Sequence, residues 1–363
     1  MSHLCAIQVE DYAYKRITGT GGIGSGMFFV LEQDHTLGRN ESRLGELLPF
    51  KDYCKQHIIL HYIAALLGAP GRFEVHPVGK VGDDAIGMSL LEQMQQVGMD
   101  TEHVKVMPGS STLFSVCFQY PDKTGGNITT GNSASAGVTA NDIDEYFAAV
   151  TTVGKEIVLS VPEVPLAARI RLLELGRKRT SLNVASLLSG EVAAFREQGG
   201  FALTDLLSVN IDEAEKISGV AVTATSKATV IEQCVQVLKS ENPSIAVLIT
   251  DGADGVYAFR GDTSFHRPTY RVTAVSTAGA GDAFLAGTIC GLCCGLPLYG
   301  NAEETDLPDA IALGNLLAAF SVTSPDTIHP GANAANLKLF SEQMGADKWF
   351  APLFRNAGAS QEI

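Results

Sequence analysis

The residues best suited to chemistry lie at 275–287, in the stretch V-S-T-A-G-A-G-D-A-F-L-A-G. Gly279, Ala280 and Gly281 carry almost no side chain, and Asp282 follows them at the predicted start of a helix. Unpaired N–H groups and the positive end of the helix dipole favour an anion at such a position. A carboxylate beside that anion can orient a hydroxyl and accept its proton, as phosphoryl transfer requires. The same residues also fit an Asp-capped helix that packs through small side chains.

The pattern of the chain predicts an α/β fold that would position this stretch. Short runs rich in β-branched residues alternate with helical runs, which is typical of a parallel sheet covered on both faces. We therefore expect one domain, residues 1–363, with a doubly wound, mainly parallel sheet flanked by helices. Predicted strands lie at 73–79, 156–160, 180–184, 205–209, 245–250 and 270–276. One predicted helix starts at Asp83 or Asp84, and another spans 167–176.

Two segments interrupt this alternation. Residues 32–57 are polar, irregular and rich in charge. Residues 111–133 alternate like a β-hairpin around the turn P-D-K-T-G-G-N. We expect both segments to leave the main sheet and form a small β-lid.

Composition excludes several classes of protein. The net charge is −14 over 363 residues and no basic cluster is present, so neither nucleic acid nor a membrane surface is an expected partner. The longest apolar run, 58–69, is too short to span a bilayer and is expected to form a buried helix. Cys290, Cys293 and Cys294 lack a second ligand pair with zinc spacing and are interpreted as buried small residues, consistent with a reducing cytoplasm.

A second glycine-rich stretch, G-T-G-G-I-G-S-G at 19–26, contains the pattern G-x-G-x-x-G. This pattern would suggest a dinucleotide-dependent oxidoreductase only if a helix followed it. The next residues, M-F-F-V-L, are typical of a strand. A glycine-lined strand beside a ligand, or close packing, is the favoured interpretation.

Several segments, in order along the chain, resemble the ribokinase-like (PfkB-type) carbohydrate kinase family. The stretch S-T-A-G-A-G-D is similar to the C-terminal motif of that family. The resemblance covers roughly residues 75–330. The other matching segments are V-G-K-V-G-D-D-A-I-G (78–87), N-I-D-E-A-E (210–215), L-I-T-D-G-A-D-G-V (248–256) and A-L-G-N-L-L-A-A-F-S-V-T (312–323).

This resemblance implies roles for the matched residues. Asp282 would be the catalytic base, and the amides of Gly279, Ala280 and Gly281 would form an anion hole for the γ-phosphoryl group of ATP. Asn210 and Glu213 would organise Mg²⁺ through water; an Asn N-cap with a capping-box Glu is the alternative, and both interpretations are compatible. The residues that would meet the nucleotide are Asn210, Glu213, Thr250, Gly252, Gly255 and Asn315. Asn315 is equally explained as a polar residue bonded to neighbouring backbone.

The first 70 residues depart from the family pattern. G-S-G at 24–26 stands where the family has N-x-D, whose Asp grips sugar hydroxyls. Arg39 and Asn40 in the expected lid, and Lys55 and His57 near a helix start, are candidate substitutes. Their cations suggest an anionic acceptor such as a sugar phosphate or sugar acid; a solvated lid face is the alternative. The predicted substrate residues are Gly24, Gly26, Arg39, Asn40, Lys55, Asn132 and Ser276.

Ser276 also stands where the family commonly has Asp, beside a site for a monovalent cation such as K⁺. The resemblance thus implies an ATP-dependent kinase that phosphorylates a hydroxyl of a sugar or sugar-like molecule and uses Mg²⁺. A nucleoside kinase and a catalytically weak binding or regulatory protein of the same fold are the alternatives. Family lids frequently pair between subunits, so a homodimer is expected.

Overall fold

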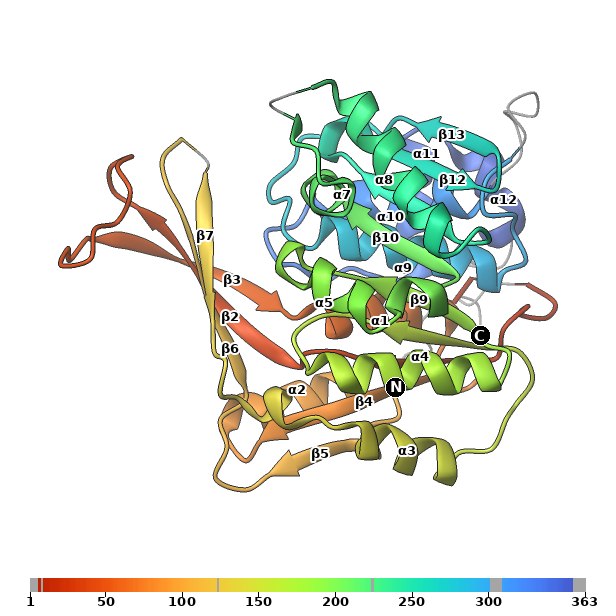
Figure 1. Cartoon of the computed structure of the whole chain (residues 1–363), viewed down its shortest axis with the longest axis horizontal. Helices are drawn as coiled ribbons and strands as arrows, with labels where there is room; N and C mark the ends of the chain where they lie inside the picture. Colours follow the sequence, from red (N-terminus) through yellow and green to blue (C-terminus); the bar gives the residue numbers. More distant parts are fainter. Residues whose placement is uncertain (1–5, 8, 123, 223–224, 301–308, 355–363) are drawn as a thin grey trace, which may run out of the picture.

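The main sheet has nine strands in the order β13-β12-β11-β10-β9-β8-β1-β4-β5. Figure 1 shows the computed structural model, which describes residues 6–7, 9–122, 124–222, 225–300 and 309–354. All neighbouring strands are parallel except at one edge, where β12 and β13 run antiparallel. The strands are β1 Arg16–Thr20, β4 Glu74–Gly82, β5 Val104–Met107, β8 Glu156–Ser160, β9 Leu182–Ser186, β10 Leu206–Asn210, β11 Ala246–Thr250, β12 Val256–Arg260 and β13 Thr263–Arg267.

Helices cover both faces of this sheet, because the strand residues alternate between two apolar cores. Within β8, Ile157 and Leu159 join one core and Val158 joins the other. The first core is covered by α1 Lys55–Leu67, α2 Ala85–Gln96, α9 Ala280–Cys293, α10 Ala310–Ser321, α11 Ala334–Gln343 and α12 Asp347–Phe354. The second is covered by α3 Ala140–Ala149, α4 Leu166–Lys178, α5 Val192–Glu197, α6 Gly200–Leu203, α7 Ile211–Ser218 and α8 Lys227–Glu241.

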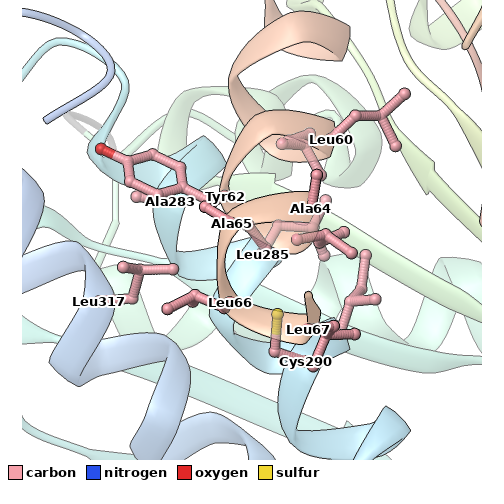
Figure 2. Packing of buried hydrophobic residues seen from close by; sticks show 14 of the residues in the cluster. Leu60, Tyr62, Ala64, Ala65, Leu66, Leu67, Ala283, Leu285, Cys290 and Leu317 are labelled. Carbon is pink, nitrogen blue, oxygen red and sulfur yellow. The ribbon is translucent and has the colours of Figure 1, made fainter. Parts of the chain in front are cut away.

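The packing of α1 and α10 against α9 fixes the helix that starts with the glycine-rich stretch (Figure 2). Leu66 of α1, Leu285 of α9 and Leu317 of α10 belong to the same core. Gly287 lets α10 approach α9 closely, since a Cβ there would lie 2.8 Å from the carbonyl oxygen of Leu313. The buried helix predicted at 58–69 is confirmed over residues 58–67 of α1, which ends before its C-cap, Gly68.

A separate four-stranded sheet forms the lid, which projects from the body as an arm (Figure 1). Its order is β3-β2-β6-β7, from β2 Gly24–Leu31, β3 Gly45–Tyr53, β6 Leu113–Gln119 and β7 Gly125–Thr129. The lid begins at Gly24, earlier than the expected bound of residue 32, because β2 pairs with both β3 and β6. The glycine-rich stretch 19–26 therefore leads into a strand, which removes the dinucleotide interpretation.

One predicted strand is wrong. Residues 270–276 belong to no strand; β13 ends at Arg267, and the chain then runs irregularly to α9. The apolar residues that suggested a strand have another cause, since Tyr270 and Val272 pack against the first core from outside the sheet. Within the described residues, every helix is too short or too polar to span a bilayer.

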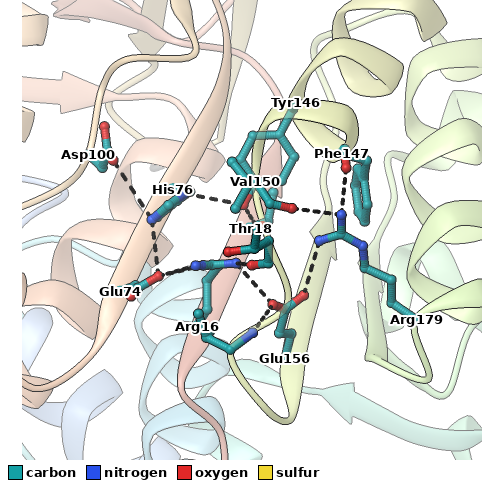
Figure 3. Close-up of polar contacts among 12 residues, drawn as sticks. Arg16, Thr18, Glu74, His76, Asp100, Tyr146, Phe147, Val150, Glu156 and Arg179 are labelled. Carbon is teal, nitrogen blue, oxygen red and sulfur yellow. Dashed lines mark hydrogen bonds and ion pairs between the residues drawn. The ribbon is translucent and has the colours of Figure 1, made fainter.

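The N-terminal ends of the parallel strands, called the N-terminal edge of the sheet below, carry an ion network (Figure 3). The first residues of three neighbouring strands, Arg16, Glu74 and Glu156, lie in register. Arg16 Nε donates to Glu74 Oε2 at 2.6 Å, and Arg16 Nη1 donates to Glu156 Oε1 at 3.0 Å. Arg179 lies 3.8 Å from the other oxygen of Glu156. Opposite charges therefore satisfy one another here.

Candidate active site

A cavity of about 700 Å³ opens at the C-terminal ends of the parallel strands, the C-terminal edge of the sheet. Two parallel strands end there side by side, β10 at Asn210 and β11 at Thr250. Both residues line the cavity, together with Asp282 and Asn315. Ligands of open α/β sheets bind outside the carboxyl ends of the strands, so this is the expected position of a site.

The start of α9 forms one wall of the cavity. Gly279 is its N-cap with φ of 76°, and a Cβ there would lie 2.8 Å from the Thr327 carbonyl oxygen, so glycine is required. The Ala280 amide donates to the Thr277 carbonyl at 3.3 Å, whereas the amides of Gly279 and Gly281 have no protein acceptor among the described residues. Two of the three amides expected in the anion hole are thus open, and the Ala280 amide is engaged.

Asp282 lies in the first turn of α9 and is buried beside the cavity. Lys55, the first residue of α1, places its Nζ 3.3 Å from Asp282 Oδ1. The packing of α1 on α9 brings together these two residues, which are 227 positions apart in the sequence. The Asp282 charge raises the pKa of Lys55, so the lysine stays a cation at neutral pH. An acid, a cation and bare amides thus meet at one point.

Sequence reasoning missed Glu163. It lies in the turn after β8 with φ of 77°, unusual for a residue with a side chain, and its Oε2 is buried with no hydrogen-bond partner. Burial raises the pKa of this carboxyl, an effect that the Cys54 thiol and Lys55 offset in part. The signal was an acid three residues past a predicted strand, in V-P-E-V-P at 161–165.

Asp52 is a second acid that the sequence did not point to. It is the penultimate residue of β3, in the lid, and is partly buried. Burial raises the pKa of its carboxyl, and the Asp282 charge adds to this effect. Asp52 therefore belongs to the same electrostatic cluster as Asp282 and Glu163.

Asn210 and Glu213 form a reciprocal capping box at the start of α7. Asn210 Oδ1 accepts from the Glu213 amide at 2.9 Å, and Glu213 Oε2 accepts from the Asn210 amide at 2.7 Å. Burial raises the pKa of Glu213. No group of three or more His, Cys, Asp or Glu fit to hold a metal occurs in the described part of the chain. A single carboxylate fits Mg²⁺ that is bound mainly through water and phosphate oxygens.

The other predicted nucleotide residues gather at the cavity. Gly252 and Gly255 line it, with φ of 51° and 96°, in the turn that follows β11. Asn315 also lines it, and its Nδ2 donates to the Pro268 carbonyl at 3.2 Å. Both interpretations of Asn315 are thus compatible with its position.

The predicted substrate residues are more scattered. Lys55 lines the cavity, and Ser276 accepts from the Ala278 amide at 3.3 Å in the loop before α9. Arg39 and Asn40 are exposed in the connection between β2 and β3, and Asn132 is exposed after β7; none of these three lines the cavity.

The remaining candidates are buried or packed. Gly24 is buried against the backbone of Leu113, and Gly26 faces Asp52. His57 is fully buried, and burial holds its pKa well below the usual value. The expectation that His57 supplies a cation is therefore wrong.

Comparison with known proteins identifies the family. Residues 61–334 match the pfkB family carbohydrate kinase, and the chain belongs to that family. A ribokinase from Staphylococcus aureus (strain COL) is 27% identical over 249 residues, covering 68% of this chain and 75% of the relative. The resemblance and the ATP-dependent carbohydrate kinase class expected from the sequence are confirmed.

Solved structures show the same fold. Aminoimidazole riboside kinase from Salmonella enterica, complexed with aminoimidazole riboside and an ATP analog, has a TM-score of 0.65 at 19% identity, covering 90% of this chain and 99% of that one. A ribokinase II from E. coli in complex with ATP and Mg²⁺ has a TM-score of 0.66 at 16% identity, covering 91% and 99%. The doubly wound α/β fold is confirmed.

Proposed function

We propose that this protein transfers the γ-phosphoryl group of ATP to a hydroxyl of a sugar or sugar-like small molecule. The observation that carries the proposal is Asp282, buried at the cavity beside the open amides of Gly279 and Gly281 and 3.3 Å from Lys55. Phosphoryl transfer needs mainly positioning and charge stabilisation, and this corner of the cavity offers both.

Each residue of the corner has a defined task in this reaction. Asp282 accepts a hydrogen bond from the acceptor hydroxyl, orients it and takes its proton late in the transfer. The open amides stabilise the negative charge of the migrating group. Lys55 adds a positive charge at the same place, and the lid helps to exclude water.

The remaining cavity residues are assigned to the nucleotide. Thr250, Gly252 and Gly255 face the ribose and phosphates, and Asn315 faces the base. Glu213 is the residue that would hold Mg²⁺ through water; the ion would neutralise phosphate charge. A solved structure of the same fold was determined in complex with ATP and Mg²⁺, which supports these two ligands for this protein. A requirement for K⁺ follows from the family resemblance alone and enters the assay as a variable.

We also propose a homodimer formed through the lid. Leu47 and Ile128 on this sheet are 55% and 67% exposed, and Leu44, just before β3, is 75% exposed. The outer strands β3 and β7 present open edges. Sedimentation equilibrium should show a dimer that Leu47→Asp weakens. A wild-type monomer at all concentrations tested would remove the proposal.

The test of the function is an ADP-release screen with purified protein and Mg²⁺, with and without K⁺. The acceptors are D-ribose, D-fructose, D-gluconate, D-ribose 5-phosphate and adenosine. ADP release that requires a sugar supports the proposal, and release with adenosine alone would favour the nucleoside alternative. Tight ATP binding without ADP release from any acceptor would favour the catalytically weak binding protein instead.

A further inference from the structure

Two glycines at the base of the lid are each covered by a carboxylate from another part of the chain. A Cβ at Gly26 would lie 2.5 Å from Asp52 Oδ2, and a Cβ at Gly22 would lie 2.6 Å from Glu163 Oε2. A side chain at either position would displace the acid. Gly22, between β1 and β2, and Gly26, within β2, therefore contribute space, and the carboxylates come from β3 and from the turn after β8.

The end of β3 is hydrogen-bonded to the loop that follows α10. The Lys51 amide donates to Asp326 Oδ1 at 2.9 Å, and the Tyr53 amide donates to Thr327 Oγ1 at 3.1 Å, on either side of Asp52. Thr327 is also the residue that Gly279 packs against. The loop after α10 therefore contacts both the end of β3 and Gly279 at the start of α9. Asp52, although it belongs to the lid, is held in position relative to α9 by this loop.

The charge of Asp52 is not compensated. No ion pair joins it to a cation within the described ranges, and the side chain that contacts its carboxylate is the Cys117 thiol, at 3.6 Å from Oδ2. Among the described residues, the cluster contains four carboxylates, Asp52, Glu163, Glu213 and Asp282, and the cation Lys55, which pairs with Asp282. A thiol is a weak donor and leaves acceptor positions of this partly buried carboxylate open, and hydroxyl donors from a ligand would fill them.

We propose that Asp52 determines acceptor specificity, accepting hydrogen bonds from hydroxyls of an uncharged sugar and disfavouring anionic acceptors. This inference rests on the proposed function and names its substrate class. Carboxylates at this position repel a sugar acid or a sugar phosphate, and they bind adjacent hydroxyls through charge-assisted hydrogen bonds. The anionic acceptor suggested by the charges of Arg39 and Lys55 is therefore disfavoured.

The experiment compares Asp52→Asn with wild type, using D-ribose and D-fructose as neutral acceptors and D-gluconate and D-ribose 5-phosphate as anionic ones. A hydrogen bond to a charged group is worth about 1.5–3 kcal/mol, so KM for the neutral acceptor should rise about 10- to 100-fold. KM for ATP should stay within about twofold, because Asp52 does not line the nucleotide cavity. The ratio of anionic to neutral kcat/KM should also rise, a change that a merely structural role would not produce.

Two further variants keep the test sharp. Glu46→Gln makes the same acid-to-amide change on an exposed residue of β3 and should leave both KM values unchanged. Gly26→Ala pushes a methyl group against Asp52 and should raise the acceptor KM with intact Asp52, but add little in the Asp52→Ala background.

The outcomes separate this inference from the proposed function. An active wild type whose acceptor KM and anionic-to-neutral ratio are unchanged by Asp52→Asn overturns the role of Asp52 alone. A wild type that releases no ADP with any acceptor, and shows no acceptor binding by calorimetry, overturns the proposed function and this inference with it.

Discussion

The two edges of the main sheet treat buried charge in opposite ways. At the N-terminal edge, Arg16 bridges Glu74 and Glu156, so each acid has a cation (Figure 3). At the C-terminal edge, Glu163 has a buried oxygen without a partner, and Asp52 has no ion pair among the described residues. The compensated edge serves the fold, and the uncompensated edge is prepared for a ligand.

β8 connects these two environments. Glu156 is its first residue and Glu163 follows its last residue by three positions. Folding alone does not favour an uncompensated buried carboxylate, because its desolvation is not repaid until a partner arrives. The difference between the edges therefore separates residues that stabilise the protein from residues that would act on a ligand, and mutations should reveal it.

The largest expected effect is that of Asp282→Asn on turnover. Loss of a general base typically costs about 10²–10⁴-fold, so kcat should fall by that factor. The affinity for ATP, measured by calorimetry, should change little, because asparagine preserves the shape of the cavity. Near-normal turnover would remove Asp282 from the mechanism.

At the other edge, Arg16→Met should destabilise the protein rather than its chemistry. Removing one partner of a buried ion pair costs about 3–5 kcal/mol, measurable as the free energy of unfolding in denaturant. Arg171→Met is the matched control, since Arg171 pairs with Asp144 and Glu174 at the surface, where such pairs contribute about 0–1 kcal/mol. Equal effects of the two variants would contradict the structural role of the network.

A smaller effect is expected from Glu213→Gln. Glutamine keeps the capping box, so the folded structure should survive. The half-saturating Mg²⁺ concentration in the ADP-release assay should rise about tenfold, typical of a group that supports a metal through water. An unchanged Mg²⁺ dependence would reduce Glu213 to a helix cap.

The sequence predicted the scaffold well because local periodicity encodes it. The strand expected at 156–160 is β8, and the helix expected at 167–176 lies within α4. The strand expected at 270–276 is absent, because apolar residues that border a cavity mimic the pattern of a strand. An apolar pattern indicates that residues are buried, but it does not distinguish a strand in a sheet from a segment that packs against the core.

The candidate site was predictable mainly where contiguous motifs carry it. Gly279 to Asp282 stand together in the sequence and start one helix. Asp52 and Glu163 reach the same place through β-strand register and a positive-φ turn; Asp52 leaves no local signature, and the only signal of Glu163 is its position three residues past a predicted strand. Arg39 looked suitable by charge, but the structure places it in an exposed part of the lid.

The smallest expected effect is the pH dependence of the free energy of unfolding of Glu163→Gln relative to wild type. Burial raises the pKa of Glu163 in the folded protein above its value in the unfolded chain. Above the folded-state pKa, the ionised carboxylate therefore lowers the free energy of unfolding. This destabilisation disappears as the pH falls toward the unfolded-state pKa. Without ligand, Glu163→Gln should therefore be at least as stable as wild type at pH 7 and should lose any advantage near pH 4.

The most direct test of the contrast between the two edges is the free energy of unfolding of Glu163→Gln and Glu156→Gln at pH 7 without ligand. The two variants make the same chemical change at the two ends of β8. The account predicts that Glu156→Gln loses about 1.5–3 kcal/mol, the worth of a hydrogen bond to a charged group, whereas Glu163→Gln loses none. A Glu163→Gln variant as destabilised as Glu156→Gln would contradict it.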